Sequence, residues 1–287
     1  GLGRAGLVAS RLLIELGRSA SEAVAAVRKV RPGAIETDGQ MNFVHGCVAA
    51  PEHQPALDAK AVRDRALGAL VGLAVGDAVG TTLEFKPRDS YPRLTDMVGG
   101  GPFQLEPGQW TDDTAMALAL ADSLIACDGL DEIDLMQRFL SWYREGAYSC
   151  TGTCFDIGIT TRQALMRFAK DGDPVAGDTD PMSAGNGSLM RLAPIALRYF
   201  DDEAALVDAA ARQSRTTHAA PEAVDGCVAF ARVLGDAIAG KPRSEVTRSR
   251  DHGYAGDIAD VMAGSWRSKS REEISSSGYV VHSLEAA

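Results

Sequence analysis

The sequence predicts a mostly α-helical protein. Of the 287 residues, 45% are hydrophobic, which is enough to build a sizeable core. Apolar residues recur at helical spacing in stretches that are separated by loops rich in glycine and proline. After residue 60, no stretch shows the alternation of apolar and polar residues that is typical of β-strands. Together these observations favour a large helical domain.

Composition narrows the partners and the compartment. The formal net charge is -10, and no run is rich in Lys or Arg, which argues against a nucleic acid partner. An odd number of cysteines without a Cys-x-x-Cys pair suits a reducing cytoplasm better than a disulfide framework or a zinc knuckle. The cysteines are Cys47, Cys127, Cys150, Cys154 and Cys227. The chain starts without Met and without a basic leader, so we expect a fragment or a processed piece, and no targeting signal is read.

The chain opens with a glycine-rich turn, Gly1–Gly6, that leads into an apolar helix, Leu7–Leu16. Backbone N–H groups and an arginine at a helix N-terminus form a cradle for phosphate. With a second helix at Ser19–Arg31, residues 1–44 resemble the C-terminal part of a tyrosine or dual-specificity phosphatase, an α/β domain that uses Cys-x5-Arg. Arg4 matches the phosphate-binding arginine, but the nucleophilic cysteine would precede the first residue. We therefore expect no phosphatase activity from this short α-rich piece.

A linker and a long apolar helix follow. Residues 45–61 contain prolines and little periodicity, which is typical of a linker. Residues Ala66–Leu83 form an apolar helix with Asp77 as its one charged residue. Its length would allow a membrane span, but glycine recurs at every fourth position and forms one smooth stripe. The stripe consists of Gly68, Gly72, Gly76 and Gly80. We expect another backbone to pack closely on this stripe in a soluble protein without a membrane partner.

Two carboxylates and two hydroxyls gather in Gln109–Thr114, at the start of a helix that is apolar on every side. Thr111 or Asp112 alone would be interpreted as a helix cap, and that alternative stays open. Adjacent carboxylates repel each other unless a cation or a shared proton lies between them. Oxygen ligands suit a hard ion such as Mg²⁺ or Mn²⁺. The stretch therefore predicts a metal site, with capping as an equal alternative.

Further polar features lie near the ends of predicted helices. Glu84 stands where the first long helix gives way to a loop, so its carboxylate can point at a site. Asp156 precedes the helix Ile159–Lys170, which favours a role as its N-cap. The loop Ser183–Arg191 exposes backbone N–H groups to a phosphate, with a simple turn as the alternative. The remaining predicted helices span Ile133–Glu145, Thr216 to about Ala239, Ile258–Trp266 and Tyr279–Ala287.

Five short motifs follow one another along residues 62–287. They are Gly76-Asp77-Ala78-Val79-Gly80 with Glu84, Trp110-Thr111-Asp112-Asp113-Thr114, Cys154-Phe155-Asp156-Ile157-Gly158, Gly185-Asn186-Gly187-Ser188-Leu189-Met190-Arg191 and Thr217-His218. In content and order they resemble the ADP-ribosylglycohydrolase family, and residues 264–267 with 277–287 look like its dinitrogenase reductase-activating branch. The resemblance implies an all-α fold with a two-metal Mg²⁺ or Mn²⁺ centre.

The same resemblance implies a role for each motif. Thr111, Asp112 and Asp113 would be metal ligands. The implied catalytic residues are Glu84, beside the metals and the scissile bond, Asp112, Asp113, and Asp156, which lines the substrate site. The implied substrate-binding residues are Gly185, Asn186, Gly187, Ser188 and Met190, which cradle the diphosphate, and His218, which contacts ADP-ribose. The implied reaction is hydrolysis of the bond between ADP-ribose and a protein side chain, most often arginine, in a modified protein such as dinitrogenase reductase.

One departure from the family pattern affects the metal site. The family supplies its remaining ligands from a late Gly-Asp-x-Asp-Thr motif, which does not occur before Ala287. We therefore expect the domain at 62–287 to be truncated before this motif, to bind at most one ion weakly and to hydrolyse its substrate slowly. Two alternatives stay open. One is a catalytically inactive ADP-ribose-binding module, and the other is a phosphatase whose helical domain recognises the substrate.

Overall fold

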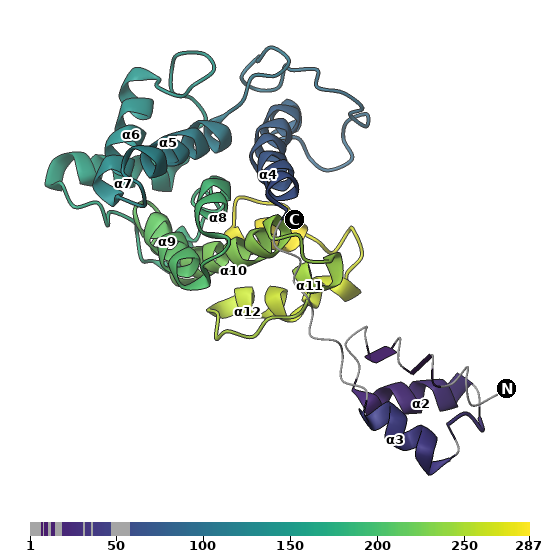
Figure 1. Cartoon of the computed structure of the whole chain (residues 1–287). Helices are drawn as coiled ribbons and strands as arrows, with labels where there is room; N and C mark the ends of the chain where they lie inside the picture. The colour runs from purple at the N-terminus through teal and green to yellow at the C-terminus, as the bar shows by residue number, and fades with distance from the viewer. Residues whose placement is uncertain are drawn as a thin grey trace. The chain divides into compact units, whose positions relative to one another are not determined.

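The computed structural model describes residues 19–30, 32–35, 37–46 and 58–287, together with residues 7, 9, 10, 13 and 14. The chain divides into two compact units, Gly1–Asp58 and Ala59–Ala287 (Figure 1). Arg4, the predicted phosphate-binding residue, lies outside the described residues, and so does most of the predicted linker.

The first unit is helical in its described part. Its helix α2 (Ala20–Val30) begins with a capping box. The Ser19 hydroxyl accepts a hydrogen bond from the Glu22 amide at 3.3 Å, and the Glu22 carboxylate accepts one from the Ser19 amide at 2.9 Å. A second helix, α3, spans Asp38–Gly46. The apolar cluster of this unit consists of Ile14, Ala23, Val24, Val27, Ala34, Ile35 and Val44.

The second unit is all-α in its described residues, which confirms the predicted fold class. The β-bridges there are isolated pairs, and none extends into a strand. The helices are α4 (Ala59–Gly80), α5 (Asp112–Ala126), α6 (Glu132–Glu145), α7 (Ile159–Asp171), α8 (Ala193–Tyr199), α9 (Glu203–Arg215), α10 (Pro221–Ile238), α11 (Arg243–Val246), α12 (Gly256–Ala263) and α13 (Val280–Ala286), with the 3-10 turns η1 (Thr81–Leu83), η2 (Pro181–Ser183) and η3 (Ser265–Ser268).

Helix α5 lies inside the second unit and contacts α4, α6 and α8. Met116, Ala119 and Leu120 are fully buried along it, as its uniformly apolar sequence predicts. Burial on nearly every side fixes the position of the helix, and therefore of the two aspartates in its first turn. This is the main way in which the fold positions the site.

Helix α4 is as apolar as α5 but has an open face. It packs on α5, α8 and α10, while Leu67, Val71 and Val75 on its other face are about half exposed. By length and composition it would also be able to cross a membrane, and 17% of its most apolar window is buried. The prediction of a closely packed glycine stripe is wrong for the described residues, where no atom lies within 4 Å of a Cβ built at Gly68, Gly72, Gly76 or Gly80. The helix packs through the opposite face, and sequence periodicity alone does not reveal which face is covered.

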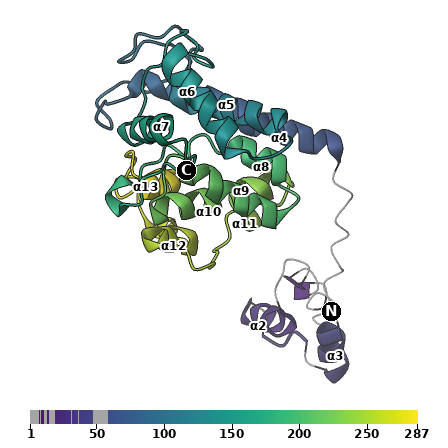
Figure 2. The same ribbon diagram turned by 90° about the vertical axis from the view of Figure 1, so that its left-hand side faces the viewer.

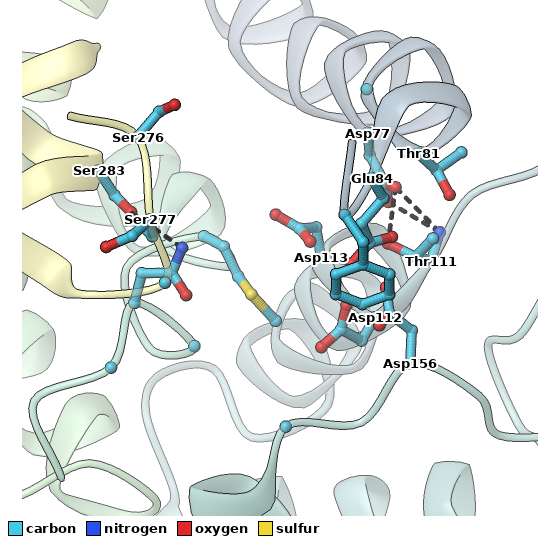
Figure 3. Close-up of a pocket in the computed structure, with 18 of the residues that line it drawn as sticks. Asp77, Thr81, Glu84, Thr111, Asp112, Asp113, Asp156, Ser276, Ser277 and Ser283 are labelled. Carbon is cyan, nitrogen blue, oxygen red and sulfur yellow. Dashed lines mark hydrogen bonds between the residues drawn. The ribbon is translucent and has the colours of Figure 1, made fainter. Parts of the chain in front are cut away.

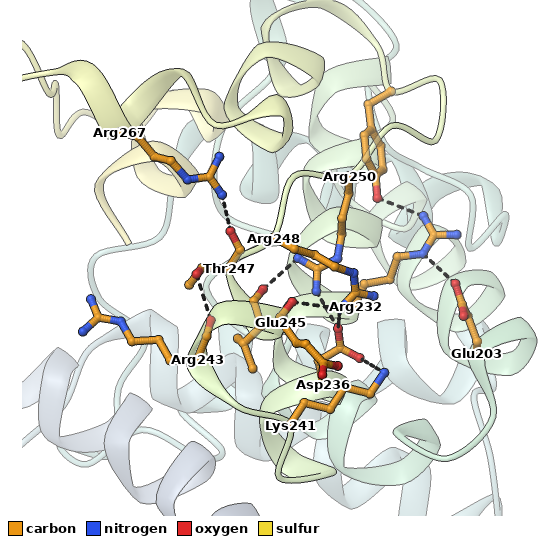
Figure 4. A network of polar contacts seen from close by, with 12 residues as sticks. Glu203, Arg232, Asp236, Lys241, Arg243, Glu245, Thr247, Arg248, Arg250 and Arg267 are labelled. Atoms are coloured by element: carbon orange, nitrogen blue, oxygen red, sulfur yellow. Dashed lines mark hydrogen bonds and ion pairs between the residues drawn. The ribbon is translucent and has the colours of Figure 1, made fainter. Parts of the chain in front are cut away.

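The C-terminal half of the unit is organised around α10 (Figure 2). This helix begins with Pro221, whose fixed φ suits the first turn, and contacts α4, α8, α9, α11, α12 and α13. After α10 the chain is tied back by Asp236 (Figure 4), which pairs with Lys241 at 2.7 Å, Arg248 at 2.8 Å and Arg250 at 2.5 Å. The polar segment after α10 is therefore anchored by one carboxylate.

Two details of the predicted helices differ from the structure. The small residues of Ser183–Arg191 were expected to open directly onto a helix, but the loop ends in turns and α8 begins only at Ala193, with Pro194 in its first turn. No helix was predicted at α9, whose apolar pattern is mixed. Thr216 lies just after α9, so the helix expected from that residue begins instead at Pro221.

Candidate active site

Most of the residues singled out in the second unit surround one cavity of about 1060 Å³. Figure 3 shows acids from α4, α5 and the loops beside them on one side, and serines from the C-terminal segment on the other. We call Glu84, Asp112, Asp113 and Asp156 the carboxylate end. We call Gly185–Met190 together with His218 the glycine-loop end.

The carboxylate end is built on Asp77, near the end of α4. Its carboxylate accepts hydrogen bonds from the amide and hydroxyl of Thr111, at 3.0 and 2.8 Å, and from the amide and hydroxyl of Thr114, at 3.0 and 2.7 Å. These amides are among the free N–H groups at the start of α5. Thr111 is the N-cap residue, but its own side chain makes no cap bond. The capping alternative is therefore wrong for Thr111, since Asp77 from another helix caps α5.

This arrangement sets the direction of the Thr111 hydroxyl. A threonine hydroxyl has one hydrogen to donate and two lone pairs. Because the hydrogen is directed to Asp77 at 2.8 Å, the lone pairs remain for a ligand on the cavity side. Asp77 thus prepares Thr111 to act as an oxygen donor next to Asp112.

The two adjacent aspartates are held in an unfavourable electrostatic setting. Burial raises the pKa of Asp112 well above its usual value, and the negative charges of Asp113 and Asp156 raise it further. Burial, followed by the charges of Asp77 and Asp156, raises the pKa of Asp113 to about 7. A cation placed between these carboxylates would offset the repulsion and favour their ionised forms.

Glu84 and Asp156 complete the carboxylate end from two loops. Burial raises the pKa of Glu84, against the opposing effect of a hydrogen bond with Asp156. Burial and the charge of Glu84 raise the pKa of Asp156 to about 7. Asp156 has a left-handed backbone with φ of 58°, which is uncommon for a residue with a side chain. It is not the N-cap of α7, because Gly158 occupies that position, so the N-cap interpretation of Asp156 is wrong.

The donor set suits a hard divalent ion in kind. Thr111, Asp112 and Asp113 offer oxygen only, which is what Mg²⁺ and Mn²⁺ prefer. Thr81 adds an unused oxygen, since its hydroxyl is buried, lines the cavity and has no hydrogen-bond partner within the described residues. No group of three or more His, Cys, Asp or Glu in the described ranges has the arrangement of a metal site. The chemistry of the donors therefore fits, while an octahedral ion would need further oxygens.

The glycine-loop end offers fewer backbone donors than the sequence predicts. The Gly185 amide donates to the Ser183 carbonyl at 2.7 Å, and the Asn186 amide donates to the Gly278 carbonyl at 2.9 Å. The amides of Gly187 and Ser188 have no acceptor in the part of the chain that the structure describes. Gly187 lines the cavity and Ser188 does not, so the predicted cradle is reduced to the Gly187 amide.

His218 forms the wall behind this loop. It is 3% exposed, and its Nδ1 lies 2.8 Å from the Thr217 hydroxyl. Burial, followed by the positive charge of Arg191, lowers the pKa of His218 to about 3, so the ring is neutral at physiological pH. A Cβ at Gly187 would lie 2.7 Å from the His218 ring, which explains why glycine is needed there. The neutral ring can therefore face a ligand as a hydrogen-bonding group at close range.

The other predicted substrate-binding residues divide into two groups. Gly185, Asn186 and Met190 line the cavity, but the Asn186 side chain donates to the Ser283 hydroxyl at 2.9 Å and so braces the loop. Ser188 does not line the cavity. Its side chain is fully buried, with its hydroxyl 2.8 Å from that of Ser214.

Several residues that shape the site had no role predicted from the sequence. Asp77 was noted as the one charge in an apolar helix and as part of the first family motif, and these were the available signals. Ser276, Ser277 and Ser283 come from a distant C-terminal segment. Residues 277–287 were noted as resembling one branch of the family, but no role was predicted for these serines. Gln213, Ser214 and Thr216 are buried beneath the glycine loop, and a polar run at the C-terminal end of α9 was the only hint.

Comparisons with known proteins point in one direction. The family model described as ADP-ribosylglycohydrolase matches residues 58–287. The ADP-ribosylarginine hydrolase Tri1 of Serratia proteamaculans (strain 568) is 45% identical over 225 residues, which cover 78% of this chain and 61% of the relative. The ADP-ribosyl-[dinitrogen reductase] glycohydrolase of Rhodospirillum rubrum is 38% identical over 184 residues, which cover 63% of this chain and 60% of the relative. The chain thus spans about three fifths of the length of these curated relatives.

A solved structure agrees with these sequence relatives. The protein described as an ADP-ribosylglycohydrolase-related protein complex superposes with a TM-score of 0.69 at 41% sequence identity. The match covers 79% of this chain and 75% of that chain.

Proposed function

Because the chain belongs to the ADP-ribosylglycohydrolase family, we propose that its second unit binds ADP-ribose and hydrolyses the bond that joins ADP-ribose to an arginine side chain of a modified protein. The observation that carries this proposal is the single cavity with two chemically different ends. The glycine-loop end offers an unpaired amide and a neutral histidine, and the carboxylate end offers clustered acids.

The glycine-loop end suits the diphosphate. The unpaired amide of Gly187 can donate to a phosphate oxygen, and its lack of a side chain lets the ligand and His218 approach closely. His218 stays neutral and presents a ring nitrogen without adding charge. Binding here would leave the ribose to extend towards the acids.

The carboxylate end suits the hydrolysis. Water would attack the anomeric carbon, forming a C–O bond as the C–N bond to the guanidinium group breaks. The attacking water loses one proton, and the departing nitrogen takes the electron pair of the broken bond and gains one proton. Glu84 and Asp156 share a hydrogen bond and have raised pKa values, so one of them can hold a proton while the other accepts one from water. Asp112 and Asp113 orient the ribose hydroxyls.

Thr111, Asp112 and Asp113 would hold Mg²⁺ or Mn²⁺ in this scheme. When bound, such an ion lowers the pKa of water and fixes the hydroxyls of the ribose. Asp77 supports the ion indirectly, because it holds the Thr111 hydroxyl with its lone pairs towards the cavity.

Arginine as the acceptor is supported by the named activity of the Serratia relative, and dinitrogenase reductase is one candidate partner by the named substrate of the Rhodospirillum relative. A cytoplasmic location is part of the proposal and rests on the odd cysteine set. The resemblance of residues 1–44 to a phosphatase fragment and their expected lack of phosphatase activity stay predictions. An aryl phosphate assay tests the second, and turnover above that of Arg4→Ala would contradict it.

The proposal is tested by incubating the chain with an ADP-ribosylated arginine protein and manganese, and measuring released ADP-ribose. We expect release that is lost in Asp112→Asn. Release that persists in this variant would show that hydrolysis does not need the Asp112 carboxylate, and it would contradict the proposed role of the carboxylate end.

A second candidate is an ADP-ribose-binding module without hydrolysis. It is favoured by one observation, namely that the described residues contain no metal cluster of three or more His, Cys, Asp or Glu. Calorimetry with ADP-ribose separates the two candidates. Binding without any manganese-dependent release would favour the module.

A further inference from the structure

Two arginines are almost completely buried in the second unit, and they are satisfied in different ways. Arg250 is 5% exposed and pairs with the Asp236 carboxylate at 2.5 Å (Figure 4). Arg191 is 0% exposed and makes no ion pair with any carboxylate in the described part of the chain. One buried cation therefore has a counter-ion within the protein, and the other does not.

The groups around Arg191 are all neutral. Its Nε donates to the Gln213 side-chain oxygen at 3.0 Å, and a terminal nitrogen donates to the Gln213 carbonyl at 2.9 Å and to the Thr216 hydroxyl at 3.2 Å. The guanidinium carbon lies 4.6 Å from the centre of the Phe139 ring. These contacts pair three of the five N–H donors and cover the flat face of the guanidinium, while the other terminal nitrogen lies 4.0 Å from the Met116 sulfur. None of them cancels the positive charge.

Burying a cation without a counter-ion is costly, because the low-dielectric interior replaces its hydration. Burial lowers the pKa of Arg191 to about 9, so the side chain still carries its charge at neutral pH. An apolar side chain of similar volume would avoid this cost. The retention of a charge here points to a use for it.

A chain of buried hydrogen bonds connects Arg191 to the glycine-loop end. Because arginine only donates, the oxygen of the Gln213 amide must face it, and the amide nitrogen is left to donate to the Ser188 carbonyl at 3.1 Å. The Ser188 hydroxyl lies 2.8 Å from that of Ser214, which can donate to the His218 carbonyl at 2.8 Å. The positive charge also reaches the cavity wall, since Arg191 helps to lower the pKa of His218.

We propose that Arg191 is the built-in counter-charge for the diphosphate at the glycine-loop end. It acts as a positioning residue and touches no ligand. It fixes Gln213 and Ser188 beneath the loop, and it gives this end of the cavity one uncompensated positive charge that a bound anion neutralises. This inference rests on the proposed binding of ADP-ribose.

The test compares charged and uncharged ligands in three variants. Calorimetry gives the dissociation constants of ADP-ribose, inorganic pyrophosphate and adenosine for the unmodified chain, Arg191→Met, Arg191→Lys and Arg250→Met. In Arg191→Met, the affinity for ADP-ribose and pyrophosphate should fall roughly tenfold or more, because one unit charge is lost in a medium of low dielectric constant. Adenosine binding should change by less than about twofold, and Arg191→Lys should recover most of the loss.

Arg250→Met is the matched control for a buried arginine that serves structure alone. It should lower the unfolding temperature while the ratio of ADP-ribose to adenosine affinity stays the same. Should Arg191→Met fail to fold by circular dichroism, Arg191→Gln carries the same test, because its amide can still donate to Gln213. If neither variant folded, the inference would fall, since it requires a neutral side chain to be compatible with the fold.

The contradicting results are specific. An unchanged affinity of Arg191→Met for ADP-ribose would show that Arg191 is not the counter-charge of the diphosphate. An equal loss of affinity for ADP-ribose and adenosine would assign Arg191 a purely structural role. A lysine variant as weak as the methionine variant would also contradict the inference. If the unmodified chain bound no ADP-ribose at all, the proposed function would be contradicted. The inference about Arg191 would then be tested separately, by comparing the pyrophosphate affinity of the unmodified chain with that of Arg191→Met.

Discussion

The two ends of the cavity are stabilised in opposite ways. At the carboxylate end, Asp112, Asp113 and Asp156 have raised pKa values because burial and mutual repulsion oppose their ionised forms. At the glycine-loop end, buried polar groups such as Ser188 and Gln213 are joined by hydrogen bonds. The difference indicates a division of work. At the carboxylate end, a cation or a proton would reduce the repulsion between the acids. At the glycine-loop end, hydrogen bonds hold the polar groups in place, which suits the proposed binding of the diphosphate.

Replacing an acid at the carboxylate end should give the largest effect on hydrolysis. Asp112→Asn should lower the rate of ADP-ribosylarginine hydrolysis about a thousandfold, because a preorganised charged group at the reacting centre is lost. It should also raise the free energy of unfolding of the metal-free chain by about 1 kcal/mol, because one repelling charge is removed. Activity assays and urea unfolding measure the two effects. Asp201→Asn, at an exposed position, is the control that should change neither.

Asp236 lies away from the cavity and is paired with basic residues, so it contrasts with the unpaired acids of the carboxylate end. Burial would raise the pKa of Asp236, but hydrogen bonds from Lys241 and Arg250 outweigh burial and lower it. Asp236→Asn should cost about 3 kcal/mol, because Arg250 loses its counter-ion, and ADP-ribose affinity should not change. A lowered folded pKa means that the stabilisation is present above the unfolded value of about 3.9 and is lost as the pH falls through the folded value.

Urea unfolding between pH 3 and pH 7 measures this dependence. The difference in unfolding free energy between the unmodified chain and Asp236→Asn should shrink below about pH 4. A difference that stays constant down to pH 3 would mean that the Asp236 ion pairs do not stabilise the fold.

Asp77 shares one property with each of the acids discussed above. It borders the carboxylate end of the cavity, like Asp112, but its carboxylate is hydrogen-bonded, like that of Asp236. An asparagine there can accept at its oxygen only, so Asp77→Asn should cost about 2 kcal/mol of stability and reduce hydrolysis as well. Asp64→Asn, on the exposed face of the same helix, is the matched control. Normal activity and stability in Asp77→Asn would show that the cap on α5 does not hold the site.

The smallest effect on the protein's function is expected from a change at the glycine-loop end. A Cβ at Gly187 would lie 2.7 Å from the His218 ring, so Gly187→Ala should weaken ADP-ribose binding about tenfold. Gly68→Ala on α4 meets no atom within 4 Å and should stabilise the helix by about 0.5–1 kcal/mol. Calorimetry and thermal unfolding compare the pair. Equal ADP-ribose affinity in both variants would show that the diphosphate does not bind at this loop.

Local chemistry explains which parts of the site the sequence predicts. Two acids before a uniformly apolar run place Asp112 and Asp113 at the rigid start of a buried helix, and small residues mark the glycine loop. Each of these two signals is contained in about ten consecutive residues of its own. The all-α class follows in the same way, because helical periodicity is a local property.

The unpredicted parts depend on contacts between distant segments. Asp77 caps a helix that begins 35 residues later in the chain, and Gln213 reaches Ser188 across 25 residues. The open face of α4 was missed because an apolar pattern with regular glycines does not show which face is covered. The lack of a carboxylate partner for Arg191 is also visible only in three dimensions.

The most direct test of the two-ended cavity is steady-state kinetics of ADP-ribosylarginine hydrolysis in Gly187→Ala and Asp112→Asn. We expect Gly187→Ala to raise KM with kcat nearly unchanged, because it weakens binding of substrate and transition state alike. We expect Asp112→Asn to lower kcat with the affinity for ADP-ribose retained. If both variants changed the same parameter by the same factor, binding and hydrolysis would not be divided between the two ends, and the central claim would be contradicted.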